Sequence, residues 1–110
     1  MKYSFKDRCI ESNRIMVKYL TRVPVICERS SRCDGPLLDK NKYLVPQDLT
    51  LRQFIFVIRK RLKLTPEKTI FLFIGNKVPQ NSQLLSEAYE EYKDDDGFLY
   101  ITYSFENTFG

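Results

Sequence analysis

Apolar residues recur at helical spacing in two parts of the chain. The first part is residues 5–20, where no Pro or Gly interrupts the repeat and Pro24 prevents its continuation as a helix. The second is residues 51–63, which follow the capping residue Thr50 and show the clearest helical period of the sequence. The pattern therefore predicts an amphipathic helix in each segment, and a shorter helix over residues 84–92.

Four other segments are rich in β-branched and aromatic residues, as is typical of strands. One of them, T-I-F-L-F-I, is apolar without a break, so we expect it to be a central strand that is covered on both faces. Another, K-Y-L-V-P, ends in a proline, which cannot donate to a strand ladder. The predicted strands are residues 23–27, 42–46, 69–74 and 98–103.

The order of these elements is helix, strand, strand, helix, strand, short helix, strand. A hairpin, a crossover helix and two further strands in one mixed sheet form a β-grasp arrangement. We therefore predict an α+β, ubiquitin-like β-grasp fold with a four-stranded mixed sheet and an N-terminal helical extension. The predicted divisions are residues 1–21 for the extension, 22–104 for the β-grasp domain and 105–110 for a C-terminal tail without periodicity.

Composition narrows the class of protein. A chain of 110 residues is the size of one compact domain. The absence of histidine removes Cys-His and Ser-His-Asp nucleophiles and all His-based metal sites, so we expect no enzyme, catalytic residue, metal or cofactor. The three cysteines form no C-x-x-C pair, and no segment resembles a signal peptide or a membrane span, which predicts a cytosolic protein.

The charge is unevenly distributed along the chain. Residues 1–63 hold 15 Lys and Arg against 6 Asp and Glu, whereas residues 64–110 hold 3 against 8. A basic half attracts acidic peptides, anionic lipid or nucleic acid, unless it is an ordinary solvated surface. The basic residues are not interleaved with the aromatic platforms of nucleic-acid modules, so we favour acidic peptide and expect no nucleic-acid partner.

The second helix has more apolar surface than one narrow face requires. The side chains of Phe54, Val57 and Arg61 point about a quarter-turn away from the predicted core stripe. Either this is one wide buried face, or Phe54 and Val57 are exposed together beside a sheet edge. In the second case they form a pocket for an apolar anchor with acidic neighbours. The predicted core stripe consists of Leu51, Ile55, Ile58 and Leu62.

Residues 42–46 are expected to form an edge strand. An edge strand presents unpaired N–H and C=O groups, on which an extended peptide adds as a further strand. Arg22, Lys40 and Lys42 would then face acidic residues that flank the peptide. Alternatively, basic residues beside an edge only discourage aggregation, and the strand pattern does not decide between the two.

The tail ends in Gly110, which has no Cβ. Its carboxylate can therefore enter a narrow enzyme channel and be approached closely by a thiolate or a nucleotide phosphate. A frayed chain end can also finish in glycine, so Gly110 alone does not establish a reactive C-terminus.

Several segments carry a resemblance to a known family. They are R-V-P-V-I-C-E (22–28), D-K-N-K-Y-L-V-P-Q-D-L (39–49), residues 54–61 with the ending I-R-K-R, residues 85–92, G-F-L-Y (97–100) and N-T-F-G (107–110). Over nearly the whole chain and in the same order, they resemble the autophagy ubiquitin-like modifiers, the family that contains GABA-receptor-associated protein and microtubule-associated-protein light chain three. In that family a further short helix precedes the segment that matches residues 5–8. Only residues 1–4 precede that segment here, so the resemblance implies a shortened N-terminal extension.

The resemblance implies two pockets that receive an aromatic-x-x-aliphatic peptide motif, as found in cargo receptors and autophagy machinery. Arg22 and Lys40 would contact acidic residues flanking the motif. By position, the aromatic pocket would be lined by Glu11, Ile15, Pro24, Ile26, Lys42, Leu44 and Phe98. The aliphatic pocket would be lined by Tyr43, Val45, Pro46, Leu49, Phe54, Val57, Ile58 and Arg61.

The resemblance also implies that Gly110 is an acyl donor. An activating and a conjugating enzyme would pass it through thioesters to phosphatidylethanolamine, and a cysteine protease would process or deconjugate the product. The protein would be cytoplasmic when free and on the autophagosomal membrane when lipidated, where it would support autophagosome formation. The alternative is a ubiquitin-like adaptor that binds peptides but is never conjugated.

Overall fold

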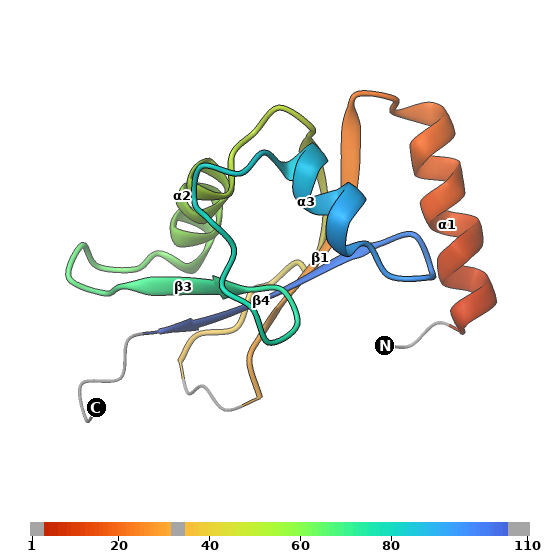
Figure 1. Ribbon diagram of the computed structural model, residues 1–110. Coiled ribbons are helices and arrows are strands. Elements are labelled where there is room, and N and C mark those ends of the chain that lie inside the picture. Colours follow the sequence, from red (N-terminus) through yellow and green to blue (C-terminus); the bar gives the residue numbers. More distant parts are fainter. Residues whose placement is uncertain (1–3, 32–34, 106–110) are drawn as a thin grey trace.

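A computed structural model describes residues 4–31 and 35–105 of the chain (Figure 1). The elements follow the predicted order, and their sheet is the predicted four-stranded mixed sheet. Within the described residues, no helix combines the length and apolar character needed to cross a membrane. The elements are α1 (Phe5–Lys18), β1 (Arg22–Arg29), β2 (Lys42–Pro46), α2 (Leu51–Leu62), β3 (Ile70–Phe73), α3 (Leu85–Tyr92) and β4 (Leu99–Phe105).

Local side-chain chemistry sets the ends of α2. The Thr50 hydroxyl accepts a hydrogen bond from Gln53 N–H (3.1 Å), while the Gln53 side-chain oxygen accepts one from Thr50 N–H (2.9 Å). This reciprocal capping box satisfies main-chain donors that the first turn leaves free. The helix ends at Lys63, whose left-handed conformation (φ 55°) turns the chain toward β3.

The strand order is β2-β1-β4-β3, with β1 and β4 parallel and the outer pairs antiparallel. The prediction that residues 42–46 form an edge strand is confirmed, because β2 lies at one edge. The prediction of a central strand over residues 69–74 is wrong, because β3 lies at the other edge. Ile70 and Leu72 face the core, but Phe71 on the opposite face is 40 % exposed. An unbroken apolar run therefore does not require cover on both faces.

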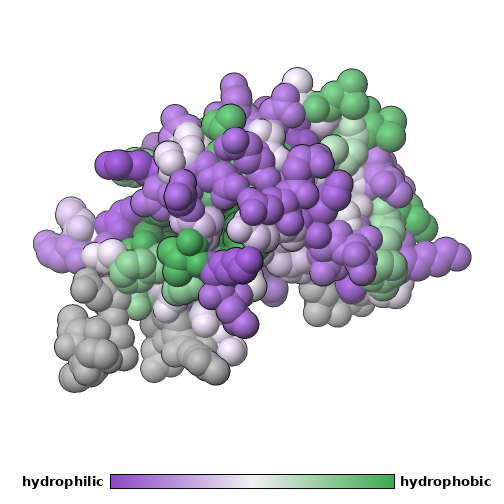
Figure 2. All heavy atoms as spheres, in the orientation of Figure 1, coloured by the Kyte–Doolittle hydropathy of each residue, from purple (hydrophilic) through white to green (hydrophobic). Residues whose placement is uncertain are grey.

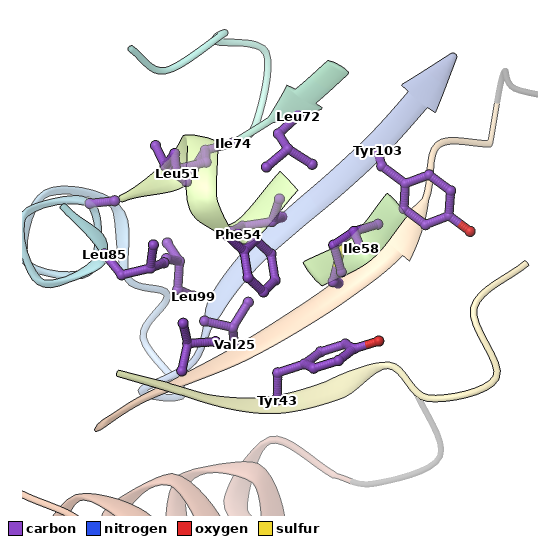
Figure 3. Close-up of a cluster of buried hydrophobic side chains, with 14 of the residues drawn as sticks. Val25, Tyr43, Leu51, Phe54, Ile58, Leu72, Ile74, Leu85, Leu99 and Tyr103 are labelled. Atoms are coloured by element: carbon purple, nitrogen blue, oxygen red, sulfur yellow. The ribbon is translucent and has the colours of Figure 1, made fainter. Parts of the chain in front are cut away.

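One face of the sheet carries α2 and α3 over a continuous apolar cluster (Figure 3). Phe54 is 1 % exposed and points from α2 toward Val25 and Leu99 on the central strands (Figure 3). The alternative in which Phe54 is exposed is therefore wrong, because α2 buries a wide face. Of the predicted core stripe, Leu51, Ile58 and Leu62 are buried, and Ile55 is half-buried.

The other face of the sheet carries α1, which contacts β1. The helix covers side chains that alternate with those of the main core, such as Pro24 and Ile26 of β1. A turn before β4 joins α1 to the sheet: Arg8 Nε lies 2.8 Å from Asp96 Oδ2, and the Ser12 hydroxyl donates to Asp96 O (2.6 Å). Residues of α1 are therefore held in place by a segment more than eighty residues away.

Candidate functional site

The open edge of the sheet at β2 is the first component of the site. Residues of an antiparallel pair alternate between those that bond the partner strand and those whose N–H and C=O point away. Cys27 N–H donates to Asn41 O (2.8 Å), which places the odd-numbered residues of β2 in the bonding positions. Leu44 lies opposite Pro24, which has no N–H. Lys42 and Leu44 therefore direct their main-chain groups away from β1.

A hollow of about 620 Å³ lies beside this edge, between α1 and β2. Three residues predicted for the aromatic pocket, Glu11, Ile15 and Lys42, line it. Lys42 Nζ lies 2.5 Å from Glu11 Oε1, so an ion pair links the two walls. Further lining residues that the sequence analysis did not identify are Asp7, Ile10, Arg14, Lys18 and Tyr19.

The other residues predicted for the aromatic pocket lie deeper. Pro24, Ile26 and Phe98 are at most 2 % exposed and are not among the lining residues of this hollow. They are therefore buried and do not form the surface of this hollow. Leu44 is half-buried on the edge strand, on the same face of β2 as Lys42.

Most residues predicted for the aliphatic pocket lie where the opposite face of β2 meets α2, whereas Pro46 lies on the same face of β2 as Lys42 and Leu44. The floor of this predicted pocket is part of the hydrophobic core. There the rings of Tyr43 and Phe54 meet edge to face, with 5.9 Å between their centroids. Val57 is 39 % exposed, so it is accessible to a ligand beside this floor. Tyr43, Val45, Phe54 and Ile58 are buried, Pro46 and Leu49 are half-buried, and Val57 and Arg61 are exposed.

Positive charge surrounds the exposed part of β2. The Arg61 guanidinium carbon lies 5.8 Å from the centre of the Tyr43 ring, and Lys40 Nζ lies 5.5 Å from it. Burial raises the pKa of Tyr43 to about 12, so its hydroxyl stays neutral beside these cations. Arg22 Nη1 donates to Leu44 O (3.1 Å), which brings a third cation, besides Lys42, to the open edge.

Comparison with known proteins decides the family. A family model described as "Autophagy protein Atg8 ubiquitin like" matches residues 7–110. The chain belongs to the Atg8 family. Autophagy-related protein 8 of Mycosarcoma maydis is 57 % identical over 99 % of this chain and 92 % of its own length. The Atg8 relatives confirm the family resemblance and its role in autophagy.

Solved Atg8 structures share the fold. The crystal structure of Trypanosoma brucei ATG8 has a TM-score of 0.93 and 40 % sequence identity, and the match covers 100 % of this chain and 95 % of that one. Plasmodium falciparum Atg8, solved in complex with a Plasmodium falciparum Atg3 peptide, has a TM-score of 0.85 and 38 % identity, with 94 % and 91 % covered. The ubiquitin-like β-grasp fold is therefore confirmed.

The contacts of Asp96 with Arg8, Ser12, Phe98 and Tyr100 are here called the Asp96 junction. The sequence did not predict this component of the Atg8-family site. Arg8, the Tyr100 hydroxyl and Phe98 N–H all donate to the Asp96 carboxylate, whose side chain is fully buried. Burial acts to raise the pKa of Asp96, but these hydrogen bonds outweigh it and hold the pKa below its ordinary value. The ionised carboxylate fixes α1, one wall of the hollow. In the sequence, the acidic triplet at residues 94–96 before Gly97 predicted only a turn.

Gly110, the predicted conjugation residue, lies outside the described residues. The described chain ends with Phe105, the last residue of β4, which pairs with Ile70 of β3. The described chain therefore ends on β4, which lies between β1 and the edge strand β3.

Proposed function

We propose that this Atg8-family chain is a non-enzymatic modifier that binds aromatic-x-x-aliphatic peptides along β2 and is joined through Gly110 to phosphatidylethanolamine. The observation that carries the peptide proposal is an open strand edge with a hollow on one side and an accessible apolar surface on the other. An extended peptide gains main-chain hydrogen bonds from Leu44 and specificity from pockets for its side chains.

The spacing of the motif matches the two faces of the sheet. Side chains of a strand alternate between faces, so residues three apart point to opposite faces. A peptide added to β2 therefore directs its aromatic residue toward the α1 hollow beside Ile15 and its aliphatic residue toward Val57 on the α2 side. A motif with one residue between its anchors would place both on the same face.

The cations around β2 favour acidic residues beside the motif. Arg22 and Lys40 belong to different segments that meet at this edge, and Arg22 already reaches the Leu44 carbonyl. A peptide carboxylate offers the Arg22 guanidinium a charged acceptor in place of a neutral one, which strengthens the hydrogen bond. We expect each acidic flank to raise both affinity and the association rate.

Conjugation is supported by family membership and by the terminal glycine. The complex of Plasmodium falciparum Atg8 with an Atg3 peptide supports a conjugating enzyme as a partner of this chain. In this proposal the activating enzyme, the conjugating enzyme and a cysteine protease supply the nucleophiles, and this chain supplies the carboxylate. The free protein is cytoplasmic and the lipidated form lies on the autophagosomal membrane, where it recruits cargo receptors.

Leu44→Asp tests the proposed peptide binding, and Gly110→Ala tests the proposed lipid attachment. Leu44→Asp replaces an apolar side chain at the open edge by a charged one and should weaken binding of an aromatic-x-x-aliphatic peptide at least about tenfold in calorimetry, since the bound peptide would remove the carboxylate from water and lose its apolar contact. Val78→Asp is the matched control, because Val78 is also apolar and is 64 % exposed away from this site. Unchanged affinity of Leu44→Asp would show that the peptide does not bind along β2.

The conjugation assay uses the activating and conjugating enzymes, ATP and phosphatidylethanolamine vesicles. The native chain should become membrane-bound, and Gly110→Ala should not, because its Cβ obstructs the approach to the carboxyl group. If the native chain is not conjugated but still binds peptides, the protein is the adaptor without a lipid anchor.

A further inference from the structure

A basic corner with an exposed aromatic ring lies where α2 joins β3. We define the basic corner as Phe56, Lys60, Lys63, Leu64 and Lys68. Phe56 is 61 % exposed although it lies on the same helix as the buried Phe54. The first four of these residues, with Arg59, line a hollow of about 480 Å³. Phe56 and Leu64 together give this hollow an apolar surface beside lysines, outside the peptide site.

Arg59 fixes the shape of the basic corner rather than adding to its free charge. Its guanidinium donates to the carbonyls of Thr65 (2.9 Å) and Lys68, which ties the loop after α2 back onto the helix. Glu67 is the single acidic residue between positions 59 and 68, a segment that contains five Lys and Arg residues. The lysines of the basic corner therefore act as a cationic rim around Phe56 and Leu64. Figure 2 shows a largely hydrophilic surface at this end of the molecule.

The basic corner adjoins the point where the tail departs. Lys68 Nζ lies 6.0 Å from the centre of the Phe105 ring, and Ile70 pairs with Phe105 at the end of β4. Gly110 is the fifth residue after Phe105, and five residues span at most about 18 Å even when fully extended. A chain joined to a lipid at Gly110 is thus held with this end against the bilayer.

We propose that the basic corner docks on the anionic headgroups of the membrane that holds Gly110. This inference rests on the proposed lipid attachment. Lysines attract anionic lipid at about fivefold in affinity each, and an exposed Phe and Leu enter the headgroup boundary. The short tether makes the contact intramolecular, so a surface of weak intrinsic affinity is sufficient.

Docking of the basic corner leaves the peptide site accessible. The tail departs from β4, beside the edge strand β3, and the open edge strand β2 lies two strand spacings, or about 10 Å, from β4. With the β3 side toward the lipid, the open edge of β2 faces the solvent. One orientation therefore satisfies the lipid anchor, the basic corner and the peptide site together.

Lysine footprinting tests the proposal without the conjugating enzymes. Six histidines are added after Gly110 and held by a nickel-chelating lipid in vesicles of either phosphatidylserine and phosphatidylcholine or phosphatidylcholine alone. A water-soluble acylating reagent then labels the lysines, and mass spectrometry quantifies each site. Lys77 and Lys93, exposed and outside the basic corner, are internal controls.

We expect labelling of Lys60, Lys63 and Lys68 to fall about fivefold on phosphatidylserine vesicles, and to recover in high salt, because exposed charges are screened. Phe56→Ser should reduce this protection. Val17→Ser, which removes a 78 % exposed apolar side chain from α1, should leave it unchanged. Equal labelling on both vesicles, or protection centred on the lysines at the β2 edge, would overturn the docking proposal.

The footprint and the enzymatic assay separate two failures. Conjugation of the native chain without any footprint at the basic corner overturns this inference and leaves the proposed function standing. A footprint on tethered chains without enzymatic conjugation supports the surface and contradicts lipid attachment at Gly110.

Discussion

On the face of the sheet that carries α2 and α3, the covering side chains form one continuous apolar cluster, whereas α1 on the other face is joined through a buried ionised group. Phe54 anchors the first face, and Asp96 anchors the second. Different interactions therefore stabilise the two walls of the peptide site. Hydrophobic burial stabilises the α2 wall, whereas charge and hydrogen bonding stabilise the α1 wall. The α1 wall should respond to pH and to single polar substitutions, and the α2 wall to loss of volume.

The largest effect is expected in the apolar face. Phe54→Ala should lower the free energy of unfolding by about 3–5 kcal/mol, because a fully buried ring leaves a cavity. Phe56→Ala, on the same helix but mostly exposed, should change it by less than about 0.5 kcal/mol. Urea unfolding followed by circular dichroism measures both. Similar losses in the two variants would contradict the assignment of Phe54 to the core.

A smaller loss is expected on the polar face. Arg8→Ala removes the cation from the buried Asp96 carboxylate and should lower the unfolding free energy by less than Phe54→Ala does, since Arg8 keeps some solvent contact. Because α1 forms one wall of the hollow, affinity for an aromatic-x-x-aliphatic peptide should also fall. Arg8→Lys restores the charge and should recover part of each loss. Calorimetric titration of both variants at neutral pH would detect the difference, and full affinity in Arg8→Ala would separate the junction from the peptide site.

The polar face should weaken in acid. The pKa of Asp96 is lower in the folded chain than its ordinary value of 3.8, so its ionised form stabilises the fold above that value. This contribution is lost as the pH falls through the folded pKa. The difference in unfolding free energy between the native chain and Asp96→Asn should therefore be large at neutral pH and shrink below about pH 4. A difference that stays constant with pH would exclude Asp96 as the titrating group.

The smallest effect is expected at the ion pair that crosses the hollow. Glu11 and Lys42 are each about one-third exposed, so Glu11→Gln should change the unfolding free energy by less than about 1 kcal/mol. Thermal unfolding in low and high salt would detect the loss of this pair as a reduced salt dependence. A loss as large as that of Arg8→Ala would mean that the pair, rather than the Asp96 junction, holds α1.

The helices followed from local signals. Thr50 caps α2 as its position predicts, and residues 42–46 lie at a sheet edge as expected. The position of T-I-F-L-F-I in the sheet could not be predicted from its residues. An edge strand with Phe71 on an open face has the same unbroken apolar run as a central strand. Burial of Phe54 also depends on tertiary packing against Tyr43, which helical periodicity does not describe.

The candidate site was predictable where one segment forms it. Glu11, Ile15 and Lys42 of the hollow were found through family resemblance, but the other lining residues were missed and the buried Pro24, Ile26 and Phe98 were not distinguished from residues at its surface. The burial and the role of Asp96 could not be predicted, because an acidic triplet before a glycine is typical of a solvated turn. Its burial arises only when Arg8 and Ser12 arrive from the other end of the chain.

The central claim is that a peptide adds as a strand to β2, and amide hydrogen exchange of single residues tests it most directly. Tyr43 and Val45 occupy bonding positions opposite β1, whereas Leu44 N–H points outward. Saturation with an aromatic-x-x-aliphatic peptide, followed by NMR, should slow exchange of the Leu44 amide more than about tenfold and leave Tyr43 and Val45 nearly unchanged. Slowed exchange confined to β3, or no change at Leu44 at saturation, would contradict the account.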